Sequence, residues 1–200
     1  MAENIDSTEI AQEFIEIKND PDVNAEKSHF LAKTLFPKEE WIATEHNIWV
    51  AKSRLSQEQI EPKKWNREMT QVRILTNRGS IAFFLPEKLK HGEKGSKSAD
   101  LVLNGEVVEM KTISGGRATL GGKFKYGYKQ GALLLKDCTL TKKHSVFIRL
   151  LSDLSVKSVR TKISGELKNR FDEGSFICFF EKTGKLYSWT YNELRAIIGR

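Results

Sequence analysis

The sequence predicts an α/β protein in which a mixed sheet is flanked by helices and preceded by an N-terminal helical extension. Two observations lead to this fold class. Helical and extended patterns alternate from about residue 62 onward, whereas the segment before residue 61 has mainly helical periodicity. The charge also divides there: residues 1–60 hold 6 Lys or Arg and 12 Asp or Glu, and residues 61–200 hold 27 and 14. We therefore expect an acidic, mainly helical extension over residues 1–60 and a basic α/β domain over residues 61–200.

The extension contains two helical patterns, over residues 6–18 and 25–35. Residues 19–22 are expected to break the helix between them, and Pro37 to end the second. Residues 40–51 fit either a short hairpin or a packed helix.

The body alternates helices, strands and glycine-bearing connections. We expect, in order, a helical turn over 56–60, a helix over 66–77 that stops at Gly79, a strand over 81–85 closed by Pro86, a basic loop over 87–97, a hairpin over 98–112, a flexible segment over 115–122, a short helix over 123–131, strands over 132–136 and 145–150, a basic amphipathic helix over 156–171, a hairpin over 175–189 and a final helix over 191–198. This order predicts a mixed sheet with helices on its faces.

The predicted hairpin brings three charged residues together. Asn104-Gly105 lies between two apolar runs, and this dipeptide is typical of a two-residue hairpin turn because the turn requires positive φ at both positions. Counting outward from the turn places Asp100 opposite Glu109 in a non-hydrogen-bonded pair, with Cα atoms about 4.5 Å apart. Lys111, two residues farther along, projects from the same face of the sheet.

The two opposed carboxylates predict a metal site. Like charges directly across a sheet destabilise it, so a divalent cation between Asp100 and Glu109 is the simplest compensation. Mg²⁺ (or Mn²⁺) suits the pair because it takes oxygen ligands and keeps several waters. A lysine beside the ion, here Lys111, can orient or deprotonate a water or stabilise a developing negative charge. The alternative is a solvent-exposed hairpin whose polar face carries charges.

The composition favours an anionic partner and a reducing compartment. The formal net charge is +7 and the pI about 9.3, which suits nucleic acid, with a solvated basic surface as the alternative. Cys138 and Cys178 lie in or beside apolar runs and are expected to be reduced and buried. No zinc-ligand spacing, P-loop, Ser/His/Asp set, signal peptide or membrane-spanning stretch is recognisable, so a cytoplasmic site of action is expected. His144, at a predicted strand start, is expected at the surface.

The order of elements and these charged residues resemble the PD-(D/E)XK nuclease superfamily, whose core carries an Asp on one strand and Glu-X-Lys on the next. Here these are Asp100 and Glu109-Met110-Lys111, although no proline precedes Asp100. The resemblance covers about residues 66–150 and leaves residues 1–60 without a counterpart. It implies a restriction-endonuclease-like fold and a metal-dependent endonuclease, with Asp100 and Glu109 as metal ligands.

The resemblance also implies two further site residues. An acidic residue on the helix before the sheet is often an extra metal ligand in the superfamily, and Glu68 matches it. The helix after the sheet often carries a Gln or Lys that reaches the site, and Lys129-Gln130 occupies that place. Gln130 is expected to orient Lys111 or the attacking water.

Within the superfamily, residues 99–112 followed by residues 129–135 look like the C-terminal toxin domains of bacterial contact-dependent inhibition systems, several of which cleave tRNA. They are also similar to nuclease-like domains of phages and mobile elements. The resemblance therefore implies a tRNA-cleaving toxin domain, with a cognate immunity or inhibitor protein as partner, or a DNA endonuclease. A non-catalytic nucleic-acid-binding module of the same fold is the alternative from another class. The sequence does not distinguish an RNA substrate from a DNA substrate, and it does not give the oligomeric state.

Basic residues around the predicted site are the candidates for phosphate contacts. Tyr126 and Tyr128 interleave with lysines in a pattern that permits base stacking, with core packing as the alternative. The basic helix from residue 156 should pack its apolar stripe on the sheet and turn its cations outward. The expected nucleic-acid-binding residues are Arg117, Lys123, Lys125, Lys129, Arg160 and Lys162.

Overall fold

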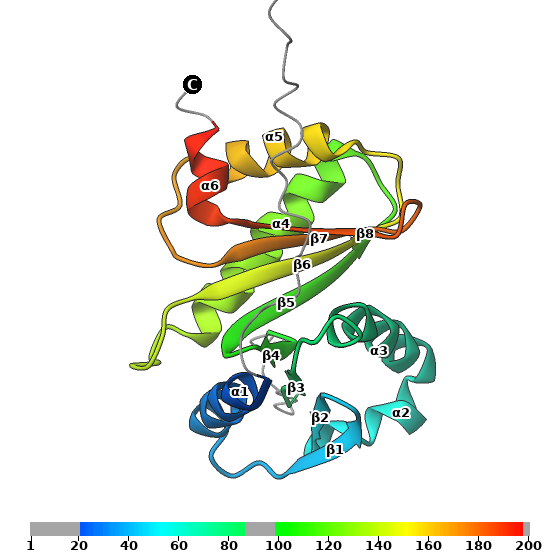
Figure 1. Cartoon of the computed structure of the whole chain (residues 1–200), viewed down its shortest axis with the longest axis vertical. Helices are drawn as coiled ribbons and strands as arrows, with labels where there is room; N and C mark the ends of the chain where they lie inside the picture. The colour runs from blue at the N-terminus through cyan, green and yellow to red at the C-terminus, as the bar shows by residue number, and fades with distance from the viewer. Residues whose placement is uncertain (1–20, 87–98, 198–200) are drawn as a thin grey trace, which may run out of the picture.

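The computed structural model describes residues 21–86 and 99–197 (Figure 1). The predicted helix over residues 6–18 and the basic loop over 87–97 lie outside this range. The elements are, in order, α1 (Pro21–Leu35), β1 (Trp41–Glu45), β2 (Ile48–Ala51), the short 3₁₀ helix η1 (Lys52–Arg54), α2 (Gln57–Ile60), α3 (Pro62–Thr76), β3 (Ala82–Phe84), β4 (Leu101–Leu103), β5 (Glu106–Ile113), α4 (Arg117–Leu134), β6 (His144–Leu150), α5 (Val156–Leu167), β7 (Ser175–Phe180), β8 (Lys185–Thr190) and α6 (Tyr191–Ala196).

The described strands form one mixed eight-stranded sheet in which they follow one another in chain order. The pairs β2–β3, β5–β6 and β6–β7 are parallel, and the other neighbours are antiparallel. Parallel neighbours need a crossover, and α4 and α5 supply those between β5 and β6 and between β6 and β7. The mixed sheet with flanking helices confirms the α/β class predicted from the sequence.

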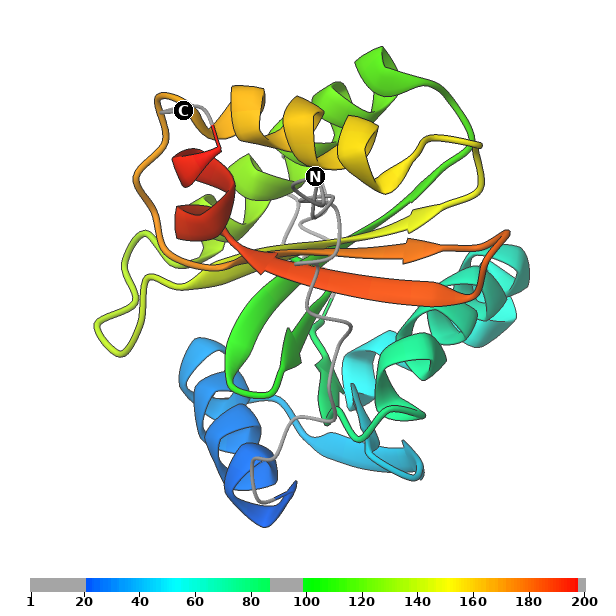
Figure 2. The ribbon, with the colours of Figure 1, turned by 45° about the horizontal axis from the view of Figure 1, so that its top comes forward.

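Helices cover both faces of the sheet (Figures 1 and 2). Along β6, Val146 and Ile148 point to the face covered by α4 and α5, whereas Phe147 points to the face covered by α3, as strand alternation requires. The apolar stripe of α5, formed by Val159, Ile163 and others, is fully buried against α4 and the sheet, as predicted. Helix α1 packs on β3 and β4. None of the described helices combines the length and apolar composition needed to cross a membrane.

The central hairpin forms with the predicted register. Leu103 pairs with Glu106, and Leu101 pairs with Val108. Asn104 and Gly105 have φ values of 50° and 82°, the positive values that the two-residue turn requires. Local turn chemistry alone therefore fixes the pairing of β4 with β5.

The N-terminal region is more closely joined to the sheet than the sequence indicated. Of the two interpretations for residues 40–51, the hairpin is observed, and β1 and β2 extend the sheet at the β3 edge. Helix α1 begins at Pro21, inside the predicted break, because a helix tolerates proline at its first position, where the missing N–H would have no partner. Region 41–54 thus contributes both strands and side chains to the body.

Helix α4 replaces three predicted elements. The flexible segment over 115–122 and the strand over 132–136 are wrong, because residues 117–134 form one continuous helix. Its glycines permit close packing instead of ending the helix. A Cβ at Gly131 would lie 2.8 Å from His144 Cδ2, and one at Gly127 would lie 3.1 Å from Glu109 Cγ. The absence of side chains at these positions brings the helix backbone close to β5 and β6.

Some of the remaining predictions are confirmed, and one is wrong. Cys138 and Cys178 are free and buried, as expected. The final helix, α6, begins at a capping box formed by Thr190 and Glu193. His144 is fully buried, so its predicted surface position is wrong. Its ring packs against Gly131 and edge-on to Tyr128, a tertiary arrangement that the sequence gives no local sign of.

Candidate active site

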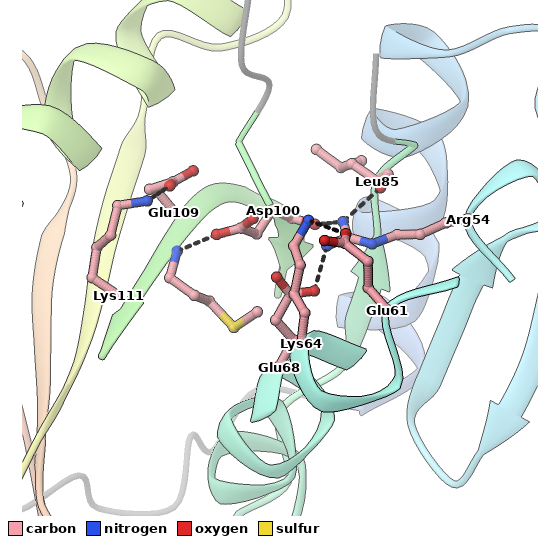
Figure 3. A network of polar contacts seen from close by, with 9 residues as sticks. Arg54, Glu61, Lys64, Glu68, Leu85, Asp100, Glu109 and Lys111 are labelled. Carbon is pink, nitrogen blue, oxygen red and sulfur yellow. Dashed lines mark hydrogen bonds and ion pairs between the residues drawn. The ribbon is translucent and has the colours of Figure 1, made fainter. Parts of the chain in front are cut away.

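The start of β4 places Asp100 beside the middle of β5. Strand alternation along β5 puts Glu109 and Lys111 on one face of the sheet, and Asp100 directly precedes Leu101, which pairs with Val108. The Asp100 carboxylate is held in place by the backbone N–H of Met110, which donates to Oδ2 at 2.8 Å. Figure 3 shows Asp100 between two ion pairs, Glu109 with Lys111 on one side and Arg54 with Glu68 on the other.

Glu109 has a buried carboxylate, and only one of its two oxygens has a partner in the structure. Its residue is 1% exposed, and its Oε1 forms an ion pair with Lys111 Nζ. Its second oxygen, Oε2, is buried and has no hydrogen-bond partner in the structure. Lys111 Nζ also lies 5.4 Å from the centre of the Tyr126 ring on α4, in cation–π range. A buried carboxylate oxygen without a donor costs free energy, so this atom indicates a position where a cation or donor binds.

Helix α4 adds an amide to the same face. Gly127 packs against the Glu109 side chain, and Gln130 lies three residues farther along the helix. Gln130 is 7% exposed, and its Oε1 is buried without a hydrogen-bond partner. Two buried acceptor oxygens, Glu109 Oε2 and Gln130 Oε1, are thus presented from the strand and the helix that packs on it. Lys129, its neighbour in the predicted pair, is exposed on the outer surface of α4.

Glu68 reaches the site from α3 in a buried ion pair. Arg54 Nη2 donates to Glu68 Oε2 at 2.8 Å, and Arg54 Nη1 donates to the backbone carbonyls of Leu85 and Asp100 at 2.8 and 3.1 Å. Burial raises the pKa of Glu68; Arg54 acts in the opposite direction, and the nearby charge of Asp100 raises this pKa further. Glu68 therefore lies close to Asp100 and is held by an arginine.

Two residues that support the site were missed from the sequence. Arg54 anchors the start of β4 through the Asp100 carbonyl, and it is 2% exposed. Gln71 of α3 donates through Nε2 to the Lys111 carbonyl at 2.9 Å and accepts from Thr112 Oγ1 at 3.1 Å. The helical spacing of Gln71 from Glu68 places both on the sheet-facing side of α3, which was a usable signal. No comparable signal existed for Arg54.

A divalent cation fits this group of residues. Mg²⁺ is commonly bound through one or two carboxylates with waters completing its shell, and Asp100 and Glu109 provide two. The unpartnered Oε2 of Glu109 is a suitable ligand atom, and the amide oxygen of Gln130 is of the same hard donor type. Within the described residues, no group of three or more His, Cys, Asp or Glu is placed to hold a metal. The residues therefore fit a partly hydrated ion better than a closed protein cage.

The expected nucleic-acid-binding cations differ in their surroundings. Lys125 and Lys162 both pair with Glu166, at 2.9 and 2.6 Å, so α4 and α5 are joined by a shared carboxylate. Lys129 lines a surface pocket on α4. Arg117 and Lys123 are exposed on the same helix, and Arg160 is half-buried on α5.

A second buried polar cluster lies around His144, away from Asp100. His144 Nε2 is 3.9 Å from Asp172 Oδ2, and neither Nε2 nor the hydroxyl of the neighbouring Tyr191 has a hydrogen-bond partner in the structure. Burial lowers the pKa of His144, although the Lys142 carbonyl, Asp172 and Glu106 act in the opposite direction. The neutral form of the ring is therefore favoured in the folded protein.

Comparison of the chain with protein-family models, with curated proteins and with solved structures gives no match.

Proposed function

We propose that this protein is a divalent-metal-dependent endonuclease with a restriction-endonuclease-like core, which cleaves phosphodiester bonds in nucleic acid. The succession α3–β3–β4–β5–α4–β6 supports the fold proposal, because it repeats the helix, three-strand, helix and strand order of the superfamily that the sequence resembles. The ion pair of Glu109 with Lys111, and the hydrogen bond that holds the Asp100 carboxylate to the backbone N–H of Met110, support the chemical proposal.

The single observation that carries the proposal is the state of Glu109. Its side chain is buried, one oxygen faces the ammonium of Lys111, and the other has no partner. A buried carboxylate near an aspartate lowers the stability of the fold unless a cation compensates the charge. One lysine compensates one of these two charges, which leaves a net negative site suited to a divalent ion.

In the proposed reaction, a bound Mg²⁺ or Mn²⁺ supplies Lewis acidity toward a phosphoryl oxygen and toward water. Asp100 and Glu109 would hold the ion, and the Met110 N–H keeps the Asp100 carboxylate oriented. Lys111 donates to the scissile phosphate or to the attacking water and offsets the negative charge that develops. Gln130 orients that water or Lys111. Glu68, held by Arg54 near Asp100, is the candidate for an additional ligand.

The substrate and partners that we propose are those implied by the resemblance of the sequence to the superfamily. A tRNA-cleaving toxin domain with a cognate inhibitor protein, acting in the cytoplasm, is the first assignment, and a DNA endonuclease of a phage or mobile element is the second. The basic residues of α4 and α5 would contact phosphates in either case.

The test is hydrolysis of total tRNA and of plasmid DNA in Mg²⁺, in Mn²⁺ and in EDTA. We expect cleavage with either metal, none in EDTA, and a loss of at least about 100-fold in Asp100→Asn, Glu109→Gln and Lys111→Met. Asp153→Asn and Lys182→Met are matched controls, because they alter an exposed surface ion pair and should cleave like the wild type. Absence of metal-dependent cleavage of both substrates, or cleavage unaffected by the site substitutions, would contradict the proposal.

A non-catalytic nucleic-acid-binding module is the second candidate, and a specific observation favours it. Glu109 and Glu68 are each paired with a protein cation, as in a core whose charges compensate one another. Such a module would bind tRNA or DNA with a strong salt dependence, and Asp100→Asn would leave that affinity unchanged. Binding without cleavage in Mg²⁺ and Mn²⁺ would favour this candidate over the enzyme.

A further inference from the structure

The outer surface of α4 carries a pocket of about 510 Å³. Gly122, Lys125, Lys129 and Ala132 follow one another at spacings of three or four residues, so they form one stripe along the helix, and Tyr126 lies beside Lys125. Two other residues close the pocket, Tyr128 of the same helix and Arg170 from the segment after α5.

The pocket combines aromatic walls with cations. Tyr126 lines the pocket and is 45% exposed. Tyr128 is a fixed wall, since its hydroxyl accepts a hydrogen bond from the Asp172 N–H at 3.3 Å and the Arg170 guanidinium lies 5.3 Å from its ring centre. None of the described carboxylates forms an ion pair with Lys129 or Arg170. The charge of these two cations is therefore available to an anionic ligand.

The pocket adjoins the candidate active site through Tyr126. One side of this tyrosine lines the pocket, and its ring centre is 5.4 Å from Lys111 Nζ, which pairs with Glu109. A group bound against Tyr126 is therefore separated from the Glu109–Lys111 pair by a single ring. The two sites lie close enough for one ligand chain to occupy both.

We infer that this pocket binds an unpaired nucleotide, so that the substrate is single-stranded or looped nucleic acid with one base held against Tyr126 and its phosphate beside Lys129 and Arg170. The inference rests on the proposed function. Aromatic rings that stack bases, combined with cations that follow the backbone, are the usual recognition elements for single strands. In a duplex the bases are already stacked and their faces are covered, so a pocket whose wall includes the partly exposed ring of Tyr126 favours a base that is splayed out.

Gly122 offers a substitution that fills the pocket without disturbing the fold. A Cβ at this position would meet nothing within 4 Å, and the residue lies inside α4 without a positive φ. Gly122→Trp should therefore fold and place an indole where the base is proposed to bind. Gly165→Trp is the matched control, because Gly165 is also an exposed helical glycine with open space at its Cβ but lies on α5 outside the pocket.

The test measures the binding of fluorescent ten-nucleotide single strands of RNA and DNA, and of a matched duplex, in EDTA and in the full-length Asp100→Asn background. We expect Gly122→Trp and Tyr126→Ala to weaken single-strand binding by about tenfold or more and to leave duplex binding unchanged, with Gly165→Trp equal to the parent. Lys129→Ala should make the salt dependence shallower, by about 0.7 in the slope of log affinity against log salt.

Single-strand affinity that is the same in Gly122→Trp as in Gly165→Trp would overturn the inference, as would equal losses for single strand and duplex. Because no metal or cleavage enters this measurement, its outcome is separate from that of the hydrolysis assay. Pocket-dependent binding without hydrolysis would contradict the nuclease alone, and hydrolysis with pocket-independent binding would contradict the pocket alone.

Discussion

The two halves of the sheet are stabilised in different ways. Around β6–β8, α5 and α6, the interior is largely apolar, with Phe124, Phe176 and Trp189 among its fully or almost fully buried side chains. Around β3–β5 and α3, the interior includes the buried charges of Arg54, Glu68 and Glu109. Buried ion pairs add little net stability relative to well-packed apolar residues, because desolvation offsets the Coulomb attraction. Under the proposed function, the charged half would serve binding or chemistry and the apolar half stability.

The largest expected stability effect comes from breaking the buried pair. Arg54→Met leaves Glu68 buried without its partner and removes the donor to the Leu85 and Asp100 carbonyls, so we expect a loss of about 3–5 kcal/mol in the free energy of unfolding. The double variant Arg54→Met/Glu68→Leu should recover most of this loss. Urea unfolding of the single and the double variant measures the loss of stability and its recovery. A double variant as unstable as the single one would show that the pair itself stabilises the fold.

Replacing the Glu109–Lys111 pair should separate stability from activity. We expect Glu109→Gln combined with Lys111→Met to leave the free energy of unfolding unchanged or to raise it by about 1–4 kcal/mol, while metal-dependent cleavage is lost. Phe176→Ala in the apolar half should do the opposite, costing about 3–5 kcal/mol without altering the rate of the folded enzyme. Thermal unfolding and cleavage assays on the same preparations test the comparison. A destabilised site variant would count against it.

The two halves should also respond to pH with opposite signs. Burial lowers the pKa of His144 from 6.5, so the unfolded chain binds more protons below that value and stability falls as the pH decreases from about 7 to 5. His144→Gln should flatten this decline. Burial raises the pKa of Glu68 from 4.5, so its contribution is complete below about pH 4.5 and is lost as the pH rises through the folded-state pKa. Urea unfolding across pH 4–8 checks both signs, and parallel slopes in His144→Gln and wild type would contradict the first.

The smallest expected change in stability comes from substituting glycines of α4, which lies between the two halves. Gly122→Ala should stabilise the protein by about 0.5–1 kcal/mol, because alanine is the better helix former and its Cβ meets open space. Gly127→Ala should not do so, since its Cβ would lie 3.1 Å from Glu109 Cγ and 3.2 Å from Val146 Cγ1. The shift in melting temperature distinguishes the two. Equal stabilisation by both would mean that α4 packs less closely on Glu109 than described.

Features set by local chemistry could be predicted from the sequence, and features set by distant contacts could not. Asn104-Gly105 determined the hairpin register between Leu101 and Val108 through the φ requirements of neighbouring residues. Gly121 and Gly122 were misread as the end of a flexible segment and Gly131 as the end of a helix, because the close approach of Gly121 to Lys162 and of Gly131 to His144 is a tertiary constraint.

The partners of the charged residues could not be predicted either, because they are set by distant contacts. Arg54 and Glu68 lie on separate elements, so only the folded arrangement of η1, α3 and β4 shows that they pair. In the sequence, His144 is a polar residue at a predicted strand start and is expected at the surface. In the structure it is fully buried against residues of α4 and α6. Candidate ligands could thus be chosen from the hairpin, but the residues that hold them in place could not.

The most direct test of the central claim is a crystal structure of the protein grown with Mn²⁺, with data collected for anomalous scattering. We predict an anomalous peak in contact with carboxylate oxygens of Asp100 and Glu109, on the face that also carries Lys111, and its disappearance in Glu109→Gln. A well-ordered site without a peak at millimolar Mn²⁺, or with the two carboxylates on opposite faces of the sheet, would contradict the account.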